Sequence, residues 1–117
     1  MFIGLIVEDE WLLRMELADA LAAAGWGVLE AGSGEAAVDA IARGAHMDFL
    51  VTDIRLPGPL DGWAVADVFR ARHPESAVIY LSANPDLAAR RAARSLFLGK
   101  PCDMAALLAA CDRLVLP

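Results

Sequence analysis

Short apolar runs alternate with alanine-rich stretches along the whole chain. The runs, which we predict to be strands, are Phe2–Val7, Gly27–Glu30, Asp48–Thr52, Ala77–Leu81 and Leu96–Leu98. The first, third and fourth runs are apolar almost throughout, instead of alternating apolar with polar residues. Continuous apolar runs of this kind are typical of strands in a parallel sheet whose two faces are both covered.

The stretches between and after these runs have the spacing of helices. We predict helices over Trp11–Ala24, Glu35–Arg43, Trp63–Arg72, Asp86–Ser95 and Met104–Leu114. In the first of them apolar residues recur on one face at helical spacing, and Gly25 marks its end. Five strand–helix units in 117 residues predict a single doubly wound α/β domain that covers residues 1–117.

Composition and charge argue against several classes of protein. The mean hydropathy of +0.48 is high. However, 24 alanines contribute much of it, and no apolar run approaches the ~20 residues of a membrane helix. The first apolar run is too short for a secretory signal and lacks a basic flank. The net charge of −6 argues against direct binding to nucleic acid. We therefore expect a cytoplasmic domain that contacts neither nucleic acid nor membrane.

Two smaller groups of residues carry little functional signal. Arg90, Arg91 and Arg94 form a basic patch, and a solvated helix face is its simplest interpretation. Cys102 and Cys111 stand nine residues apart, without a C-x-x-C motif or a nearby pair of metal ligands. We expect two reduced, packed thiols, as in other cytoplasmic proteins.

Polar side chains gather where the predicted strands end. Glu8 and Asp9 follow the first strand in LIVEDE, and Asp53 ends the third in FLVTDIRLP. Ser82 follows the fourth strand in VIYLSAN, and Lys100 follows the fifth in FLGKP. In doubly wound folds the ligand site lies beyond the carboxyl ends of the strands. We therefore expect these five side chains to converge on one pocket.

The residue types in this pocket favour phosphoryl chemistry. Three carboxylates in a small space cannot all stay ionised without a cation, and their oxygens suit Mg²⁺. Lys100 and Ser82 can both donate to a phosphoryl oxygen. An aspartate can act as the nucleophile of phosphoryl transfer, which mainly needs positioning and charge stabilisation.

Each residue taken alone also has a simpler explanation. The acids after the first strand suit a helix N-terminus, and Glu10 in particular is expected to begin the first helix. Asp53 before Ile-Arg-Leu-Pro-Gly suits a turn, Ser82 a helix cap, and Lys100 the surface. Their joint placement, each at a strand end and in chain order, favours the shared pocket.

The combination resembles the receiver domain of bacterial two-component response regulators, such as the chemotaxis receivers. The matching motifs are an acidic pair after the first strand, Asp after the third, Ser or Thr after the fourth and Lys-Pro after the fifth. The resemblance covers the whole chain. It implies a flavodoxin-like (βα)5 fold with a five-stranded parallel sheet in the order 2-1-3-4-5.

The resemblance implies a role for each acid. Asp53 would be the phosphoacceptor, and the phosphoryl group would come from a histidine kinase or a histidine phosphotransfer protein. Asp9 and Asp53 would bind Mg²⁺, with Glu8 assisting and the backbone carbonyl of Arg55 as a further ligand. Beyond its own phosphorylation and dephosphorylation, such a domain catalyses no reaction and is therefore not expected to be an enzyme.

The same resemblance implies how the signal would be held and passed on. Ser82 and Lys100 would bind the phosphoryl group, and Phe97 matches the aromatic position that turns inward on activation. The bond between Lys100 and Pro101 corresponds to the family's cis peptide. An output partner, which the sequence does not identify, would bind the face formed by Asp86–Ser95, the fifth strand and the last helix.

The chain departs from the family pattern near the site. The loop IRLPGPLDGW is about one residue longer than usual, and it carries Arg55, which, with Asn84, is expected to tune hydrolysis. The segment from Ser82 to Lys100 is several residues shorter than usual, so we expect the fourth helix or its flanking loop to be trimmed. Cys102 replaces the common phenylalanine after Lys-Pro, where it would fill a cavity.

Three other functions were weighed against this one. GSGEAA, residues 32–37, matches a dinucleotide-binding motif, but it follows the second predicted strand instead of the first. A phosphatase with an aspartate nucleophile resembles D-x-D, and here Arg55 occupies the second acidic position. A degenerate receiver would bind partners without phosphorylation, and the intact Asp9, Asp53, Ser82 and Lys100 argue against it.

Overall fold

The strands and helices of the described residues form a five-stranded parallel sheet with helices on both faces. The computed structural model describes residues 2–84, 87 and 90–115. The strands are β1 (Ile3–Val7), β2 (Gly27–Ala31), β3 (Phe49–Asp53), β4 (Ala77–Ser82) and β5 (Ser95–Gly99). The α-helices in the described residues are α1 (Trp11–Ala23), α2 (Gly34–Ala42), α3 (Gly62–Arg72) and α4 (Met104–Val115). The strand order β2-β1-β3-β4-β5 confirms the prediction.

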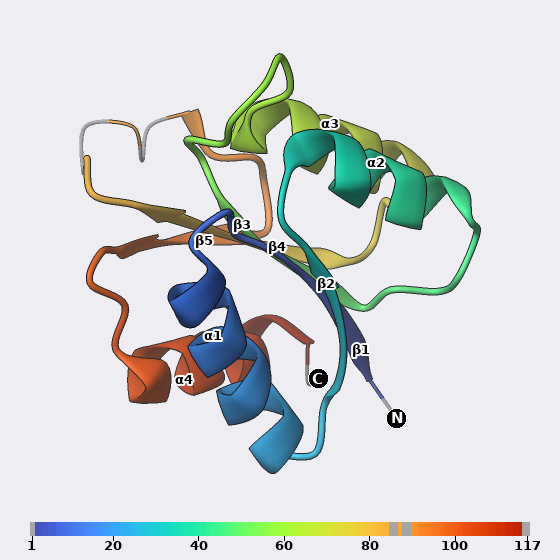
Figure 1. Ribbon diagram of the computed structural model, residues 1–117. Coiled ribbons are helices and arrows are strands. Elements are labelled where there is room, and N and C mark those ends of the chain that lie inside the picture. Colours follow the sequence, from blue (N-terminus) through green and yellow to red (C-terminus); the bar gives the residue numbers. More distant parts are fainter. Residues whose placement is uncertain (1, 85–86, 88–89, 116–117) are drawn as a thin grey trace.

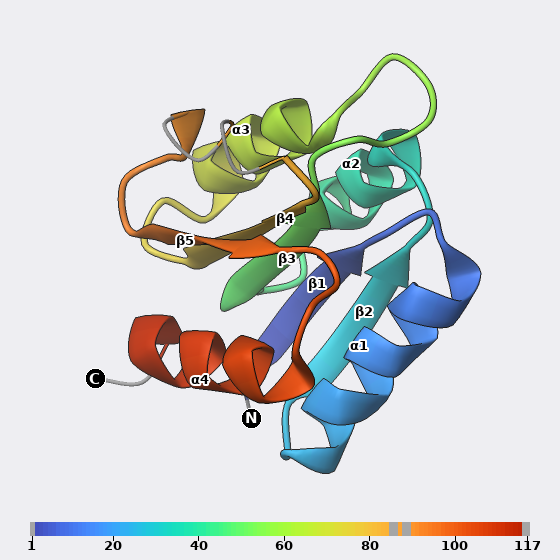
Figure 2. The same cartoon turned by 90° about the vertical axis from the view of Figure 1, so that its left-hand side faces the viewer.

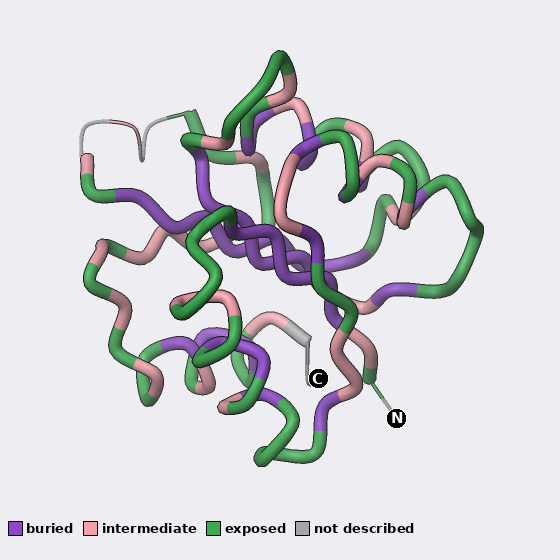
Figure 3. The backbone as a smooth tube through the Cα atoms, in the orientation of Figure 1, coloured by how far each residue is buried: buried purple, intermediate pink, exposed green. Residues whose placement is uncertain are grey.

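The helices form one layer on each side of the sheet. Helices α1 and α4 cover one face and α2 and α3 the other (Figures 1 and 2). Successive strand residues pack into opposite layers: Leu5 and Leu50 join the core under α2 and α3, whereas Ile6 and Val51 join the core under α1 and α4. Because both faces are covered, the central strands are buried almost throughout (Figure 3). Burial on both faces explains why the central strands are continuous apolar runs in the sequence.

Short polar side chains begin the helices. The Ser33 hydroxyl accepts from the Ala36 N–H at 3.1 Å, and the Asp61 carboxylate accepts from the Ala64 N–H at 2.9 Å. These bonds satisfy amides that have no partner inside their helix. Helix α1 ends just before Gly25, whose φ of +95° favours glycine, as its place in the sequence predicted.

The predicted helix over Asp86–Ser95 is wrong in its described C-terminal part. Residues 85, 86, 88 and 89 lie outside the described residues, residues 91–94 are not helical, and Ser95 already begins β5. Arg94 has φ of +52°, which a right-handed helix does not allow. The guanidinium of Arg70 donates to the carbonyls of Ala93 at 2.7 Å and Arg94 at 2.8 Å. These tertiary bonds outweigh the helical propensity of the alanine-rich stretch.

The basic patch is correspondingly not a helix face. Arg94 donates to the carbonyls of Pro74 and Glu75, and Arg90 lies 4.6 Å above the ring centre of Trp63. The expectation for the cysteines is confirmed in that both are free thiols. Burial raises the pKa of Cys111 to about 12, which keeps its thiol protonated and inert. No helix of the described residues is both long and apolar enough to cross a bilayer.

Candidate phosphoryl-accepting site

Both the backbone and the side chain of Glu8 hold this residue in place at the end of β1. Its N–H donates to the Ala31 carbonyl at 3.1 Å, which continues the pairing of β1 with β2 by one residue. Its side chain is fully buried, and Oε1 accepts from the Glu10 N–H at 3.1 Å. The neighbouring Asp9 is exposed. The acidic turn therefore has one buried carboxylate and one that is accessible to solvent.

Asp53 ends β3 in the middle of the sheet and is only 6 % exposed. The Ile54 N–H donates to the Leu81 carbonyl at 3.1 Å, which continues the pairing of β3 with β4, and the Gly62 N–H donates to the Ile54 carbonyl at 2.8 Å, which brings the start of α3 back to this point. A Cβ at Gly62 would lie 2.2 Å from the Asp53 carbonyl oxygen, so only glycine fits there. The start of α3 thereby packs directly against the backbone of Asp53.

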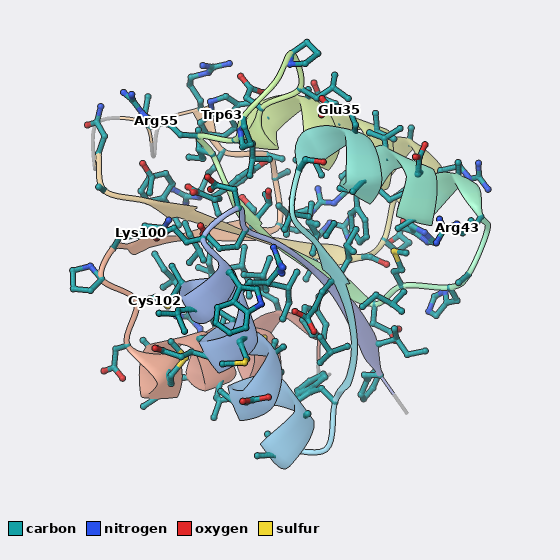
Figure 4. All side chains as sticks on the ribbon, viewed as in Figure 1. Glu35, Arg43, Arg55, Trp63, Lys100 and Cys102 are labelled. Atoms are coloured by element: carbon teal, nitrogen blue, oxygen red, sulfur yellow. The ribbon has the colours of Figure 1, made fainter. Side chains whose placement is uncertain are left out.

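Lys100 brings a cation to both acids. Its Nζ lies 2.9 Å from Asp53 Oδ2, 3.0 Å from Glu8 Oε2 and 4.0 Å from Glu10 Oε2. The lysine follows β5, an edge strand, and its N–H donates to the Ser82 carbonyl at 3.0 Å. The bond from Lys100 to Pro101 is cis. Figure 4 shows Lys100 near the end of β5, on the side of the domain where α1 begins.

The electrostatics of this cluster follow from burial and from the ion pairs. Burial raises the pKa of Glu8, although the hydrogen bond from Lys100 acts in the opposite direction. Burial acts to lower the pKa of Lys100, but its hydrogen bonds to Asp53 and Glu8 outweigh it and the pKa is raised. The ammonium therefore stays charged, while a second cation would favour the ionised form of Glu8.

An open pocket of about 380 Å³ lies beside the Asp53 carboxylate. It is lined by Asp53, Arg55, Ser82, Ala83, Asn84 and Lys100. The Ser82 hydroxyl accepts from the Asn84 N–H at 3.0 Å, so these two residues form one local turn. The pocket is large enough for a phosphoryl group and is bordered by both basic side chains. Its lining includes three of the five strand-end residues on which the sequence analysis focused.

Phe97 stands apart from the pocket. It lies in the middle of β5, opposite Tyr80 of β4, and packs half-buried against the core under α2 and α3. The family resemblance matched Phe97 to the aromatic position that turns inward on activation, and that role stays a prediction. Phe97 lies two residues before the end of β5.

The carboxylates are arranged as a hard cation requires. Glu8, Asp9 and Asp53 each offer an oxygen, and the three oxygens lie within 4.8 Å of one another. One ammonium faces these acids, so the cluster retains negative charge. Oxygen-only donors in such a cluster fit Mg²⁺ and do not favour softer metals. The donor set thus fits the cation that the sequence predicted.

One residue of the site was missed by the sequence analysis. Arg14, in the first turns of α1, donates from Nη1 to the Glu8 carbonyl at 2.9 Å. In the sequence, Arg14 is marked only as a basic residue six positions after Glu8. In the structure, the other polar residues of α1 are exposed. Such an arginine is indistinguishable from a solvated one until the helix is docked.

The fold and the site can now be compared with known proteins. The family model of the response regulator receiver domain matches residues 5–112. The chain belongs to the response regulator receiver family. Its expected membership is therefore confirmed, as is the fold that membership implies.

Relatives of this receiver include both solved domains and longer regulators. A response regulator receiver protein from Sinorhizobium medicae is 33 % identical, with a TM-score of 0.92, over 97 % of this chain and 94 % of that one. The receiver domain of the hybrid histidine kinase CckA is 30 % identical, with a TM-score of 0.85, over 97 % and 98 %. The DNA-binding transcriptional regulator NtrC of Klebsiella pneumoniae is 35 % identical over 97 % of this chain. This receiver spans only 24 % of the length of that regulator.

Proposed function

We propose that this receiver accepts a phosphoryl group on Asp53, in a Mg²⁺-dependent transfer from a phosphohistidine of a kinase or phosphotransfer protein. The observation that carries the proposal is the cluster around Asp53. Its carboxylate contacts Lys100 at 2.9 Å and shares a group of ligand oxygens with Glu8 and Asp9. A nucleophile, an ammonium and cation ligands beside an open pocket are the parts that phosphoryl transfer needs.

The transfer forms one bond and breaks one. A carboxylate oxygen of Asp53 attacks phosphorus, and the bond from phosphorus to the histidine nitrogen of the donor breaks. The imidazole leaves with the bonding electron pair, and the product is an acyl phosphate. Lys100 pairs with a phosphoryl oxygen as charge moves onto it, and the Ser82 hydroxyl donates to another.

Glu8, Asp9, Asp53 and the backbone carbonyl of Arg55 would hold Mg²⁺. When bound, the cation would neutralise the carboxylates and stabilise the negative charge of the phosphoryl oxygens. The chain's own part is to hold Asp53 in place, which its ion pair with Lys100 and the packing of Gly62 against its backbone accomplish. Water attack on the acyl phosphate reverses the modification, and Arg55 and Asn84 at the pocket rim would set its rate.

Binding of an output partner would respond to the negative charge that phosphorylation adds. A phosphoryl group brings about −1.5 to −2 charges to the pocket. Ser82 would move toward it and Phe97 inward, so that the surface of β5, α4 and the segment before β5 changes its affinity for an output partner. We place this exchange in the cytoplasm and assign the whole of residues 1–117 to the receiver. The longer NtrC relative is named a DNA-binding transcriptional regulator, and a transcriptional output fits this proposal.

Intact mass after incubation with a small acyl phosphate tests the acceptor. Wild type should gain one phosphoryl group with Mg²⁺ and none without it, and Asp53→Asn should gain none. Asp39→Asn, on the exposed surface of α2, is the matched control and should be labelled like wild type. Labelling of Asp53→Asn would refute the assignment.

A direct Mg²⁺ titration tests the ligands. Asp9→Asn should weaken binding about tenfold because it removes one charged oxygen donor. Unchanged affinity would remove Asp9 from the ligand set. The alternative, a degenerate receiver that binds partners without phosphorylation, predicts a folded wild type with neither labelling nor Mg²⁺ binding.

A further inference from the structure

Arg14 lies directly behind the acidic turn. It is in the first turns of α1, and its own N–H donates to the Glu10 carbonyl at 2.9 Å. Its guanidinium folds back, so that Nη1 donates to the Glu8 carbonyl at 2.9 Å while Nε lies 3.4 Å from Glu30 Oε1. The Arg14 side chain is 21 % exposed, which leaves these contacts partly shielded from water.

The Glu8 carbonyl belongs to the peptide that joins Glu8 to Asp9. Its orientation decides where the Asp9 carboxylate points relative to Glu8 and Asp53. The other side of Glu8 is held by its N–H bond to the Ala31 carbonyl. With Arg14 on the carbonyl, the backbone is fixed on both sides of the first acid. A charged donor makes such a bond stronger than a neutral one.

Gly32 leaves the space in which the guanidinium sits. A Cβ at this position would lie 2.8 Å from Arg14 Nη1, closer than real Cβ atoms come to a neighbour. Glu30, two residues earlier on β2, supplies the opposite charge. Three chain segments thus contribute to one contact. Helix α1 supplies the donor Arg14, β2 supplies the opposite charge of Glu30, and Gly32 after β2 leaves space for the guanidinium.

Arg14 differs from Lys100 in what it contacts. The Lys100 ammonium lies on the carboxylates themselves and competes with any other cation for them. The contact of Arg14 with the acidic turn is to the backbone carbonyl of Glu8, so it orders the turn without occupying a ligand oxygen.

We propose that Arg14 is a positioning residue for the cation site. It fixes the Glu8–Asp9 peptide so that both carboxylates face Asp53, with Glu30 and Gly32 keeping its guanidinium in place. This inference rests on the proposed role of the acids as Mg²⁺ ligands. Removing a residue that orients a metal ligand typically weakens metal affinity about 10–100-fold.

Mg²⁺ binding to Arg14→Met, measured directly by calorimetry, is the main test. We expect a loss of about tenfold in affinity. Labelling by a small acyl phosphate should need correspondingly more Mg²⁺ and then reach the wild-type extent, because Asp53 and Lys100 are untouched. Arg43→Met is the matched control, since Arg43 is exposed at the end of α2, far from Lys100 (Figure 4), and should leave affinity unchanged.

Gly32→Ala provides a second route to the same contact. Its Cβ should displace the guanidinium and weaken Mg²⁺ binding in the same direction, and should add nothing further in the Arg14→Met background. Arg14→Lys, which keeps a charged donor, should recover part of the affinity. These variants also serve if Arg14→Met fails to fold.

Two results would overturn the proposal. One is Mg²⁺ affinity within twofold of wild type in folded Arg14→Met. The other is labelling that is reduced equally at every Mg²⁺ concentration, which indicates a general structural effect. Failure of the proposed function is seen separately, as absent Mg²⁺ binding or labelling in the wild type.

Discussion

Charged residues gather both where the strands end, at the carboxyl edge of the sheet, and where the strands begin, at the opposite edge. The contacts that these charged residues make differ between the two. At the carboxyl edge, Glu8, Asp53 and Lys100 contact one another. At the opposite edge, Asp48 accepts from the Ile3 N–H at 2.8 Å, and Arg70 donates to the carbonyls of Ser76, Ala93 and Arg94. At this second edge these bonds go to backbone near the starts of strands, and two side-chain pairs accompany them, His46 with Asp48 and Arg94 with Glu75.

This difference separates chemistry from structure. A charged group bonded to backbone satisfies polar atoms that the fold would otherwise leave without partners. Buried acids that crowd around one ammonium are costly, since each must be taken out of water and the acids repel one another. Under the proposed function, a cation and a phosphoryl group use this cluster, which would explain why it is kept. Removing single charges from each edge tests this distinction.

Lys100→Met should have the largest effect. The labelling rate with a small acyl phosphate should fall about 100-fold, because a charged donor to the developing phosphoryl charge is lost. Mg²⁺ affinity should rise in the same variant, since the ammonium no longer opposes a second cation beside Glu8 and Asp53. Rapid-quench labelling and calorimetry measure the two. Labelling within threefold of wild type would show that Lys100 does not act on the phosphoryl group.

Arg70→Met should lower stability and leave the chemistry alone. The variant keeps the apolar stem of the side chain but removes bonds to three carbonyls, at a cost of about 2 kcal/mol in the free energy of unfolding. Urea unfolding measures the loss, and labelling of the folded variant should match wild type. If labelling fell more than fivefold, the two edges would be coupled and the contrast drawn here would fail.

His73→Phe should have the smallest effect, confined to acidic pH. Burial, then the neighbouring His46 and Arg72, lower the pKa of His73 below 6.5. The unfolded chain therefore binds a proton more readily than the folded one, and the free energy of unfolding declines as pH falls from 6.5 through the folded-state pKa.

Thermal unfolding between about pH 5 and pH 8 measures this dependence. His73→Phe retains a ring against Phe69 but cannot be charged, so its stability should decline less toward acidic pH than that of wild type. An equal decline in both proteins would mean that His73 does not contribute to it.

Much of the fold, and the gathering of the polar strand-end residues, could be predicted from the sequence. Continuous apolar runs predicted the central strands, and the carboxyl ends of parallel strands must meet, so Glu8, Asp9, Asp53, Ser82 and Lys100 were expected together. The structure brings Lys100 to Asp53 and Glu8 and places Ser82 in the pocket lining. These predictions depend only on periodicity and topology.

The errors arise where distant contacts decide. An alanine-rich stretch before β5 favours a helix locally, but Arg70 and the positive φ of Arg94 hold residues 93 and 94 in another conformation. Arg14 looks like any helix-surface arginine until α1 is docked beside the acidic turn. The sequence does not single out Arg14 or Arg70, because the hydrogen bonds that matter here go to backbone carbonyls, which every residue has.

The position of Lys100 on an edge strand has a consequence for how the domain is made. A chain synthesised from its N-terminus completes Asp53 and the central strands well before β5. Because β5 pairs only with β4, Lys100 reaches the acids only after β5 has joined the sheet. A nascent or truncated chain that ends before residue 100 therefore displays Asp53 without the Lys100 ammonium. Under the proposed function, competence for phosphorylation would be a late event in biogenesis, and acyl phosphate labelling would report that the last strand has docked.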